Sequence, residues 1–141
     1  MRCYHRTNRA DDILENGFRD GKGTYMTSMM LEGVFLSDRP LDENEGAHGL
    51  VVLKLEIPES VLVPYELVEE DKPYREFCVP AETVNQHGPP TIHEADFQGR
   101  SREFLLRMAD RHKAAGRVSR AKVLREIQVP FLEHHGLLEE E

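Results

Sequence analysis

The pattern of apolar and polar positions changes near residue 88. Before it, the apolar residues form short β-type runs, bounded by glycine, proline or charged residues, which predict strands. The predicted strands cover residues 2–6, 34–36, 50–57 and 74–79, with one or two further short strands within 61–68 around Pro64. After residue 91 the apolar residues recur with helical spacing. We therefore expect a β-rich body at residues 1–88 and a helical appendix at residues 91–141.

A short helix is predicted directly after the first strand. Apolar side chains within residues 10–14 recur with helical spacing, and Asn8 and Asp11 have the spacing of a capping box. Gly17 is a typical C-terminal stop, after which Phe18 can fold back onto the helix. The sequence thus predicts a strand that leads into a helix ending at a glycine.

Two helices are predicted in the appendix. The first has its apolar face at Phe104, Leu105, Met108 and Ala109. The second follows Gly116, with Ser119 as its candidate cap, and is expected to end at Pro130 because proline lacks a backbone N–H. Two other segments have no clear period: we expect residues 19–32 to be a loop or weak strands, and residues 41–49 a short helix or a loop.

Length and charge narrow the class of protein. A chain of 141 residues can form one domain with one core and a cleft. The formal net charge of −8 argues against non-specific binding to nucleic acid, but a small anionic cofactor needs only a few local cations and backbone amides. The apolar runs are far too short to span a bilayer, and the N-terminus lacks the apolar segment of a secretion signal. We therefore expect a soluble, cytoplasmic protein without a membrane partner.

The cysteines and histidines do not indicate a metal site. Cys3 and Cys78 lie in apolar contexts without metal-ligand spacing, so we expect buried, reduced thiols. His134 and His135 lie near an acidic tail, also without such spacing. The sequence has no glycine fingerprint for phosphates or dinucleotides and no nucleophile elbow.

Three residues on separate predicted strands could share a cleft. Glu76 lies in an apolar strand, where a carboxylate is costly unless it has a partner. It could polarise a ribose hydroxyl and stabilise an oxocarbenium ion, or it could face solvent, since Arg75 and Glu76 point to opposite faces. His5 could donate a hydrogen bond to a ribose hydroxyl or be a structural residue. Phe35 could stack on a nicotinamide ring or belong to the core.

Two hydroxyl residues and a basic segment add to these candidates. Thr7 could line the cleft as well as cap the following helix, and Ser37 could bind a carboxamide or simply end its strand. The basic residues of the appendix are Arg100, Arg102, Arg107, Arg111, Lys113, Arg117, Arg120, Lys122 and Arg125. They form either a solvated helix face or a contact with an acidic partner or RNA.

Taken in order, these segments resemble the ADP-ribosyltransferase superfamily, on its diphtheria-toxin and poly(ADP-ribose) polymerase side. That family has a histidine on its first strand, like His5, and then a helix ending in glycine and an apolar residue, like residues 13–18. Residues 33–38 are similar to its Gly-hydrophobic-Tyr-hydrophobic-small-Asp segment. Residues 76–79, followed by Val84 and Asn85, are similar to its glutamate strand and the Val-Asn that comes soon after.

The resemblance covers roughly residues 3–87 and implies an α+β fold, in which a split pair of small antiparallel β-sheets forms an NAD cleft. By this resemblance His5 would bind the adenosine-side ribose of NAD, Phe35 would stack on nicotinamide, and Glu76 would be the catalytic glutamate. NAD would be the substrate and no metal would be needed. ADP-ribose would pass to an acceptor on protein, nucleic acid or a small molecule.

The other residues of the implied NAD site are Arg6, Thr7 and Ser37. Arg6 takes the place of the family's glycine, whose backbone grips the carboxamide, so the Arg6 side chain must point away. Phe35 replaces the usual tyrosine, which keeps the ring and loses the hydroxyl. The second stacking tyrosine expected soon after Asp38 is missing, because residues 41–49 contain no aromatic residue.

Three other functions remain open. A catalytically weak module would bind a nucleotide or an ADP-ribosylated ligand without releasing nicotinamide. The sequence His5-Arg6-Thr7 is also similar to the start of NAD-dependent RNA 2′-phosphotransferases, which share the implied fold and do not use the glutamate. A protein-interaction domain would bind its partner through the basic helices at residues 100–125.

Overall fold

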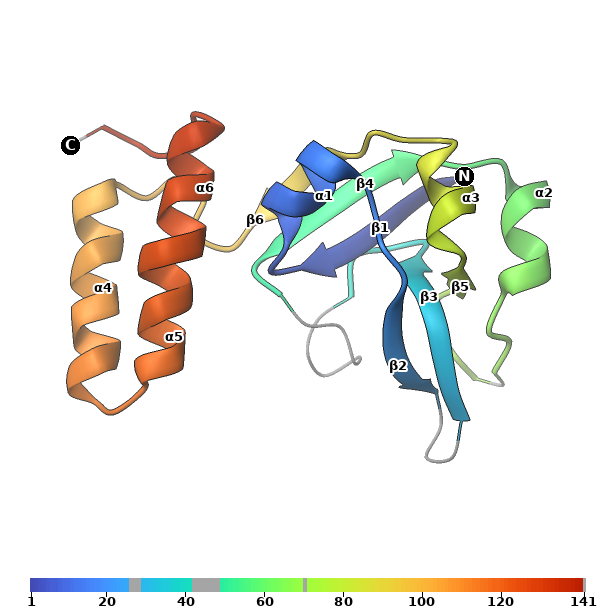
Figure 1. Ribbon diagram of the computed structural model, residues 1–141, viewed down its shortest axis with the longest axis horizontal. Coiled ribbons are helices and arrows are strands. Elements are labelled where there is room, and N and C mark those ends of the chain that lie inside the picture. Colours follow the sequence, from blue (N-terminus) through green and yellow to red (C-terminus); the bar gives the residue numbers. More distant parts are fainter. Residues whose placement is uncertain (26–28, 42–48, 70, 141) are drawn as a thin grey trace. The chain divides into compact units, whose positions relative to one another are not determined.

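The computed structural model describes residues 1–25, 29–41, 49–69 and 71–140. It divides into two compact units, Met1–His93 and Glu94–Glu141 (Figure 1). The division falls within strand β6 (Thr91–Ala95), so the segment that was predicted as purely helical begins with a strand. Most of the segment 41–49, expected to be a short helix or a loop, lies outside the described residues.

The fold class is α+β, as predicted, with an open antiparallel sheet of six strands among the described residues. The strands follow the order β2-β3-β1-β4-β6, and β5 pairs with β3 as well. The strands other than β6 are β1 (Arg2–Thr7), β2 (Gly21–Tyr25), β3 (Met29–Ser37), β4 (Val51–Glu56) and β5 (Glu76–Val79). Residues 19–32, expected to be a loop or weak strands, thus supply β2 and the first part of β3.

Strand β3 changes its neighbour along its length. Its residues 29–33 pair with β2, and residues 34–37 pair with β5. Gly33 lies at this change, where a Cβ atom would be 2.9 Å from the Sγ atom of Cys78 and 3.0 Å from the carbonyl oxygen of Val79. Such distances are far below ordinary van der Waals contact, so glycine is needed for β5 to approach this closely.

Helix α1 (Ala10–Asn16) follows β1 and ends, as predicted, at Gly17, whose φ is +87°. The predicted cap was wrong. The N-terminal residue that precedes the helix is Arg9, and no side chain caps the first turn. The side chain of Asn8 instead accepts a hydrogen bond from the backbone N–H of Leu50, at 3.0 Å, and so ties the start of α1 to the segment before β4.

The strands predicted around Pro64 were also wrong. This region forms two short helical turns, α2 (Glu59–Leu62) and η2 (Val63–Tyr65). A further short helix, α3 (Ala81–Asn85), follows β5. A run of apolar β-branched residues fits a strand by composition, but here one helical turn is enough to bury Leu62 completely. Pro64 is compatible with the first turn of a helix, where its missing N–H is not needed.

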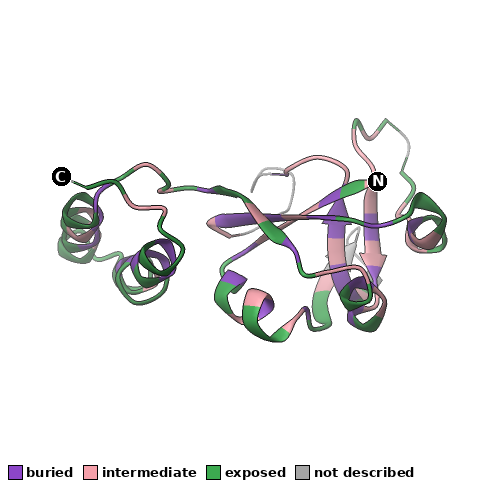
Figure 2. Ribbon diagram, turned by 90° about the horizontal axis from the view of Figure 1, so that it is seen from above, coloured by how far each residue is buried: buried purple, intermediate pink, exposed green. Residues whose placement is uncertain are grey.

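The core of the first unit lies between the sheet and the short helices, as the buried positions in Figure 2 show. Its largest fully buried side chains are Phe77, Leu36, Leu53, Ile57 and Leu62. Cys3 is buried and Cys78 is half-buried, and both are free thiols. Burial raises the pKa of Cys3 to about 11, so this thiol is protonated and unreactive at neutral pH.

The second unit is helical: its elements are α4 (Arg102–Ala114), α5 (Val118–Val123), the π-helical turn η3 (Leu124–Gln128) and α6 (Val129–His134). The hydroxyl of Ser101 caps α4 by accepting a hydrogen bond from the N–H of Phe104, at 3.1 Å. Two residues of the predicted apolar face, Leu105 and Ala109, are fully buried. No helix in the described part of the chain has the length and apolar character needed to cross a membrane.

The second helix of this unit does not end at Pro130, which corrects the prediction. Elements α5, η3 and α6 follow one another without a break. Proline cannot donate to the carbonyl four residues earlier, and its ring would clash there in an α-helix. The π-helical turn takes up this misfit: the N–H of Val129 bonds to the carbonyl of Leu124, five residues back. The helix also begins after Arg117, so Ser119 does not cap it.

Candidate functional site

The three strands that carry His5, Phe35 and Glu76 lie side by side in the order β1-β3-β5. The Nδ1 atom of His5 is 2.8 Å from the carbonyl oxygen of Phe35. Ser37 lies two residues beyond Phe35, hence on the same face of β3, and is paired directly with Glu76. Ser37 is also paired with Tyr4 of β1. Three segments far apart in the sequence therefore meet in one region of the sheet.

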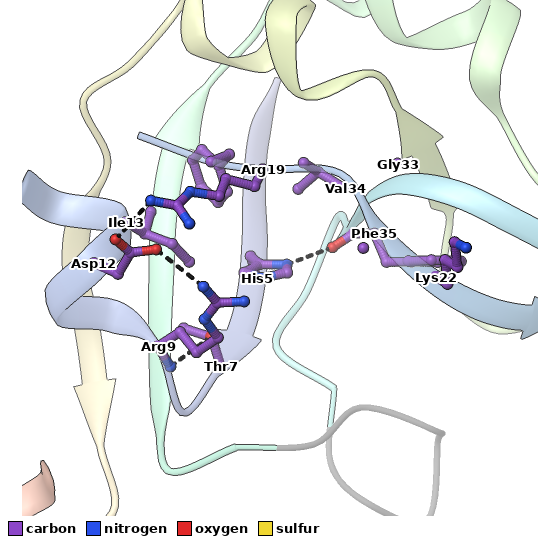
Figure 3. Close-up of a pocket in the computed structure, with 12 residues that line it drawn as sticks. His5, Thr7, Arg9, Asp12, Ile13, Arg19, Lys22, Gly33, Val34 and Phe35 are labelled. Atoms are coloured by element: carbon purple, nitrogen blue, oxygen red, sulfur yellow. Dashed lines mark hydrogen bonds and ion pairs between the residues drawn. The ribbon is translucent and has the colours of Figure 1, made fainter. Parts of the chain in front are cut away.

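A pocket of about 170 Å³ opens beside His5, between α1 and strands β1, β2 and β3 (Figure 3). The buried apolar side chains among its lining residues are Ile13, Phe18 and Val34. His5 and Thr7 add polar groups from β1, and Phe35 adds an aromatic residue from β3. Glu76 and Ser37 do not line this pocket. Side chains alternate along β1, and Tyr4 is the residue paired with Ser37, so His5 lies on the opposite face from Ser37 and Glu76. The structure therefore brings His5 and Phe35 together at the pocket and does not bring Glu76 to them.

His5 has a defined proton arrangement. A carbonyl oxygen can only accept, so Nδ1 of His5 carries the proton and donates it to Phe35. Burial lowers the pKa of His5, against a smaller opposing effect of this hydrogen bond. In the neutral ring Nε2 then has no hydrogen and acts as an acceptor. We expected His5 to donate to a ribose hydroxyl; this geometry favours accepting a hydrogen bond from one.

The rim of the pocket is positively charged. Arg9, Arg19 and Lys22 line it together with one carboxylate, Asp12. Asp12 lies 3.2 Å from Arg9 and 3.3 Å from Arg19, so it holds the two guanidinium groups near each other (Figure 3). A hydrogen bond from Asn16 lowers the pKa of Asp12, and both arginines lower it further. Three cations around one carboxylate leave a net positive rim that suits an anionic ligand.

Helix α3 fixes the residues that follow α1. The side-chain amide of Asn85 accepts from the N–H of Phe18 at 2.8 Å and donates to the carbonyl of Phe18 at 2.9 Å. A Cβ atom on Gly17 would lie 3.0 Å from Oδ1 of Asn85, so the glycine lets the amide approach. Asp20 in turn accepts from the N–H of Ala81, at 2.8 Å. These bonds hold Phe18 and the neighbouring Arg19 in place at the pocket.

The ring of Phe35 lies close to the backbone of β2. A Cβ atom at Gly23 would be only 2.8 Å from the tip of this ring. Phe35 is half-buried and lines the pocket, as an aromatic platform must if a planar ligand is to stack on it. Gly23 therefore provides the space that Phe35 occupies.

Glu76 has a close cationic partner. The Nζ atom of Lys72 lies 2.6 Å from Oε2 of Glu76 and 3.6 Å from a carboxylate oxygen of Glu69. The same ammonium group is 5.0 Å from the centre of the Tyr74 ring. Arg75, which directly precedes β5, pairs with Glu66 and Glu59 at 2.6 and 2.7 Å. The carboxylate of Glu76 is thus anchored by its neighbours before any ligand binds.

The remaining predicted residues are placed as follows. The Arg6 side chain bonds to the carbonyl oxygens of Leu41 and Gly49, at 2.6 and 3.2 Å, and does not line the pocket. The hydroxyl of Thr7 is buried and accepts from the N–H of Arg9, at 2.8 Å. The hydroxyl of Ser37 donates to the carbonyl of Arg39, at 2.7 Å. Their roles toward NAD stay predictions.

Sequence reasoning missed the charged rim. Arg9 stands just before α1, and Arg19 and Lys22 follow its glycine stop. Cations at both ends of one short helix would have been a usable signal, because such a helix brings its two ends within about 10 Å. Lys72 was missed as well, although its position four residues before Glu76 could have suggested an ion pair.

No protein family, curated protein or solved structure was found to match the chain. Among the described residues, no group of three or more His, Cys, Asp or Glu side chains is arranged to hold a metal ion. What the site can do must therefore be argued from its own residues.

Proposed function

We propose that the unit Met1–His93 is an ADP-ribosyltransferase-like enzyme, which breaks the nicotinamide–ribose bond of NAD and transfers ADP-ribose to an acceptor. The observation that carries the proposal is the adjacency of β1, β3 and β5, which bear His5, Phe35 and Glu76. The change of partner along β3 at Gly33 supports the finer fold, a sheet split into two parts around an NAD cleft.

The chemistry of the pocket supports NAD as the ligand. A diphosphate carries negative charge that Arg9, Arg19 and Lys22 can bind by charge-assisted hydrogen bonds. The Nε2 atom of His5 accepts a hydrogen bond from a ribose hydroxyl. Phe35, half-buried at the pocket, offers an aromatic ring for nicotinamide. One pocket thus combines an anion site, a hydroxyl acceptor and an aromatic platform.

In the proposed reaction, the bond between the nicotinamide nitrogen and C1′ of the ribose breaks, and nicotinamide leaves with the bonding electron pair. The ribose then carries a positive charge, which the carboxylate of Glu76 stabilises while it accepts a hydrogen bond from a ribose hydroxyl. A nucleophile of the acceptor forms the new bond to C1′, and its proton passes to water. For this Glu76 must exchange part of its contact with Lys72 for the substrate.

Nicotinamide release from NAD, followed by chromatography, tests the proposal. We expect Glu76→Gln to lower the rate by about 100-fold or more, since it removes the charge that stabilises the transition state. NAD affinity, measured by calorimetry, should change little. Glu82→Gln, an exposed carboxylate on α3, is the matched control and should retain full activity. Absence of both NAD binding and turnover in the unaltered protein would sink the proposal.

The ion pair of Lys72 and Glu76 favours a second candidate, a module that binds ADP-ribose or a nucleotide without turnover. A carboxylate that stays neutralised by an ammonium group cannot stabilise a developing cation well. This candidate predicts ADP-ribose binding with no release of nicotinamide. RNA 2′-phosphotransfer would differ from both, because it would depend on His5 and be indifferent to Glu76→Gln.

A further inference from the structure

The turn that joins α4 to α5 (Figure 1) is rich in basic residues. Residues 107–122, which we call the basic tip, contain six basic residues and one carboxylate, Asp110. The basic residues are Arg107, Arg111, Lys113, Arg117, Arg120 and Lys122, and all six are exposed. Asp110 is already bound by Arg125, outside the tip, at 2.6 Å. The tip therefore keeps a net positive charge.

The geometry of the turn brings the basic residues of both helices together. Gly116 has a φ of +82°, and the N–H of Arg117 bonds to the carbonyl of His112, at 2.8 Å. A further bond joins the N–H of Gly116 to the carbonyl of Lys113, at 3.0 Å, so the chain reverses over very few residues. A Cβ atom on Gly116 would meet nothing within 4 Å, which leaves the turn open for contact.

The charges of the tip act on one another. In the described part of the chain, no carboxylate pairs with Arg111, Lys113, Arg120 or Lys122. Partial burial lowers the pKa of His112, and the nearby charges of Arg117 and Arg120 lower it further. The missing counter-ions thus indicate a positive potential at this end of the unit, in line with the lowered pKa of His112.

We propose that the basic tip binds the phosphodiester backbone of nucleic acid. A phosphate backbone is a regular row of anions that Arg and Lys recognise without apolar contact. A protein partner would need apolar anchors, and the large apolar side chain exposed in this turn, Val118 at 60%, stands alone among cations. The chain's net charge of −8 opposes binding over the whole surface, but salt screens it beyond about 8 Å at physiological ionic strength, so a local patch can act.

Fluorescence anisotropy with a labelled 20-nucleotide RNA and a labelled DNA duplex tests this proposal on the full chain, without NAD. The result therefore does not depend on the function proposed for the first unit. With four phosphates contacted, affinity for the RNA should fall about 50-fold between 50 and 200 mM salt. Arg111→Gln/Arg120→Gln should lower the slope of log affinity against log salt by about 1 to 2. Binding should also raise the pKa of His112, measured by NMR, because phosphates offset the neighbouring arginines.

Arg2→Gln/Arg102→Gln is the matched control: it removes the same charge from arginines that already pair with Glu56 and Glu133. It should bind like the unaltered protein, and circular dichroism should show that both variants are folded. Equal losses in the two double variants would overturn the proposal. Displacement of the RNA by polyglutamate of equal charge, at equal concentration, would also overturn it in favour of an acidic protein partner. Binding of RNA or duplex DNA that ignores salt would count against it as well.

Discussion

The Nζ atom of Lys72 lies 2.6 Å from a carboxylate oxygen of Glu76, and the two side chains keep only 10% and 18% of their surface exposed. A charge that loses its partner in such a place is left poorly solvated. The pair therefore has two consequences. It holds the carboxylate that the proposed reaction needs, and it makes each residue depend on the other for stability.

The first prediction concerns this dependence. Lys72→Met should lower the free energy of unfolding by about 2 kcal/mol, because Glu76 loses its cation. Glu76→Gln should cost less, because Glu69 remains 3.6 Å from Lys72. The double variant should cost at least about 1 kcal/mol less than the sum of the two, which urea denaturation of all four proteins would measure.

The exposed pair Arg2 and Glu56 is the control, with an interaction energy below about 1 kcal/mol. Additive losses at Lys72 and Glu76 would show that the ion pair is not a stabilising contact.

The second prediction concerns the rim of the pocket. Arg19→Gln should weaken ADP-ribose binding about tenfold, since one charge-assisted hydrogen bond to the diphosphate is lost. Calorimetry with ADP-ribose measures this directly, and adenosine, which lacks the diphosphate, should bind both proteins alike. Arg2→Gln removes the same charge from a residue that does not line the pocket and pairs with Glu56, and it should leave the affinity unchanged. A similar loss for adenosine would mean that Arg19 does not act through phosphate.

The third prediction concerns the contact of Gly49 with the end of β1. A Cβ atom at Gly49 would lie 2.3 Å from the carbonyl carbon of Thr7, and the φ of Gly49 is +134°. Gly49→Ala should therefore cost about 3 kcal/mol or more, because the clash is with backbone. Gly116→Ala is the control, with a φ of +82° and no atom within 4 Å, and should cost about 1 kcal/mol. Thermal unfolding measures the stability of the two variants. Equal losses in both would show that the positive φ, and not the clash with Thr7, causes the loss at Gly49.

The sequence predicted those elements of the fold that depend on local chemistry. The glycine stop at Gly17 and the β-type runs that became β1, β4 and β5 are of this kind. The helical turns at residues 59–65 were missed because a short apolar run fits a strand and a buried helical turn equally well. The helix that continues through Pro130 was missed because its accommodation depends on a π-helical turn, which has no clear signal in composition.

The candidate site, too, could be predicted from the sequence only in part. The segments that bear His5, Phe35 and Glu76 could be chosen from the sequence. Their position on neighbouring strands depends on long-range pairing, which no local pattern specifies. The partner of Glu76 was missed because Lys72 reaches it from an irregular segment, residues 72–75, that follows the positive φ of Asp71. The direction of the hydrogen bond at His5 required the structure too, since either ring nitrogen could have been the donor.

The last prediction concerns acid sensitivity at His5. Its pKa in the folded protein lies below the ordinary value of 6.5, because burial disfavours the charged ring. The unfolded chain therefore binds more protons than the folded one below about pH 6.5, and the unfolding free energy falls as the pH drops through that value. Above it the contribution of the neutral ring is fully present. Urea denaturation at a series of pH values between 7.5 and 5 measures this loss.

The variant His5→Asn distinguishes the effect of protonating His5 on stability from the effect of losing its hydrogen bond to Phe35. The Nδ2 group of asparagine can replace Nδ1 as the donor to Phe35, but it does not titrate. The variant should lose less stability than the unaltered protein between pH 7.5 and 5, while keeping most of its stability at pH 7.5. His134→Asn, which changes an exposed ring in α6, should follow the unaltered protein over the same range. Parallel curves for His5→Asn and the unaltered protein would show that His5 is not held neutral by the fold, and the acceptor role proposed for its Nε2 atom would lose its basis.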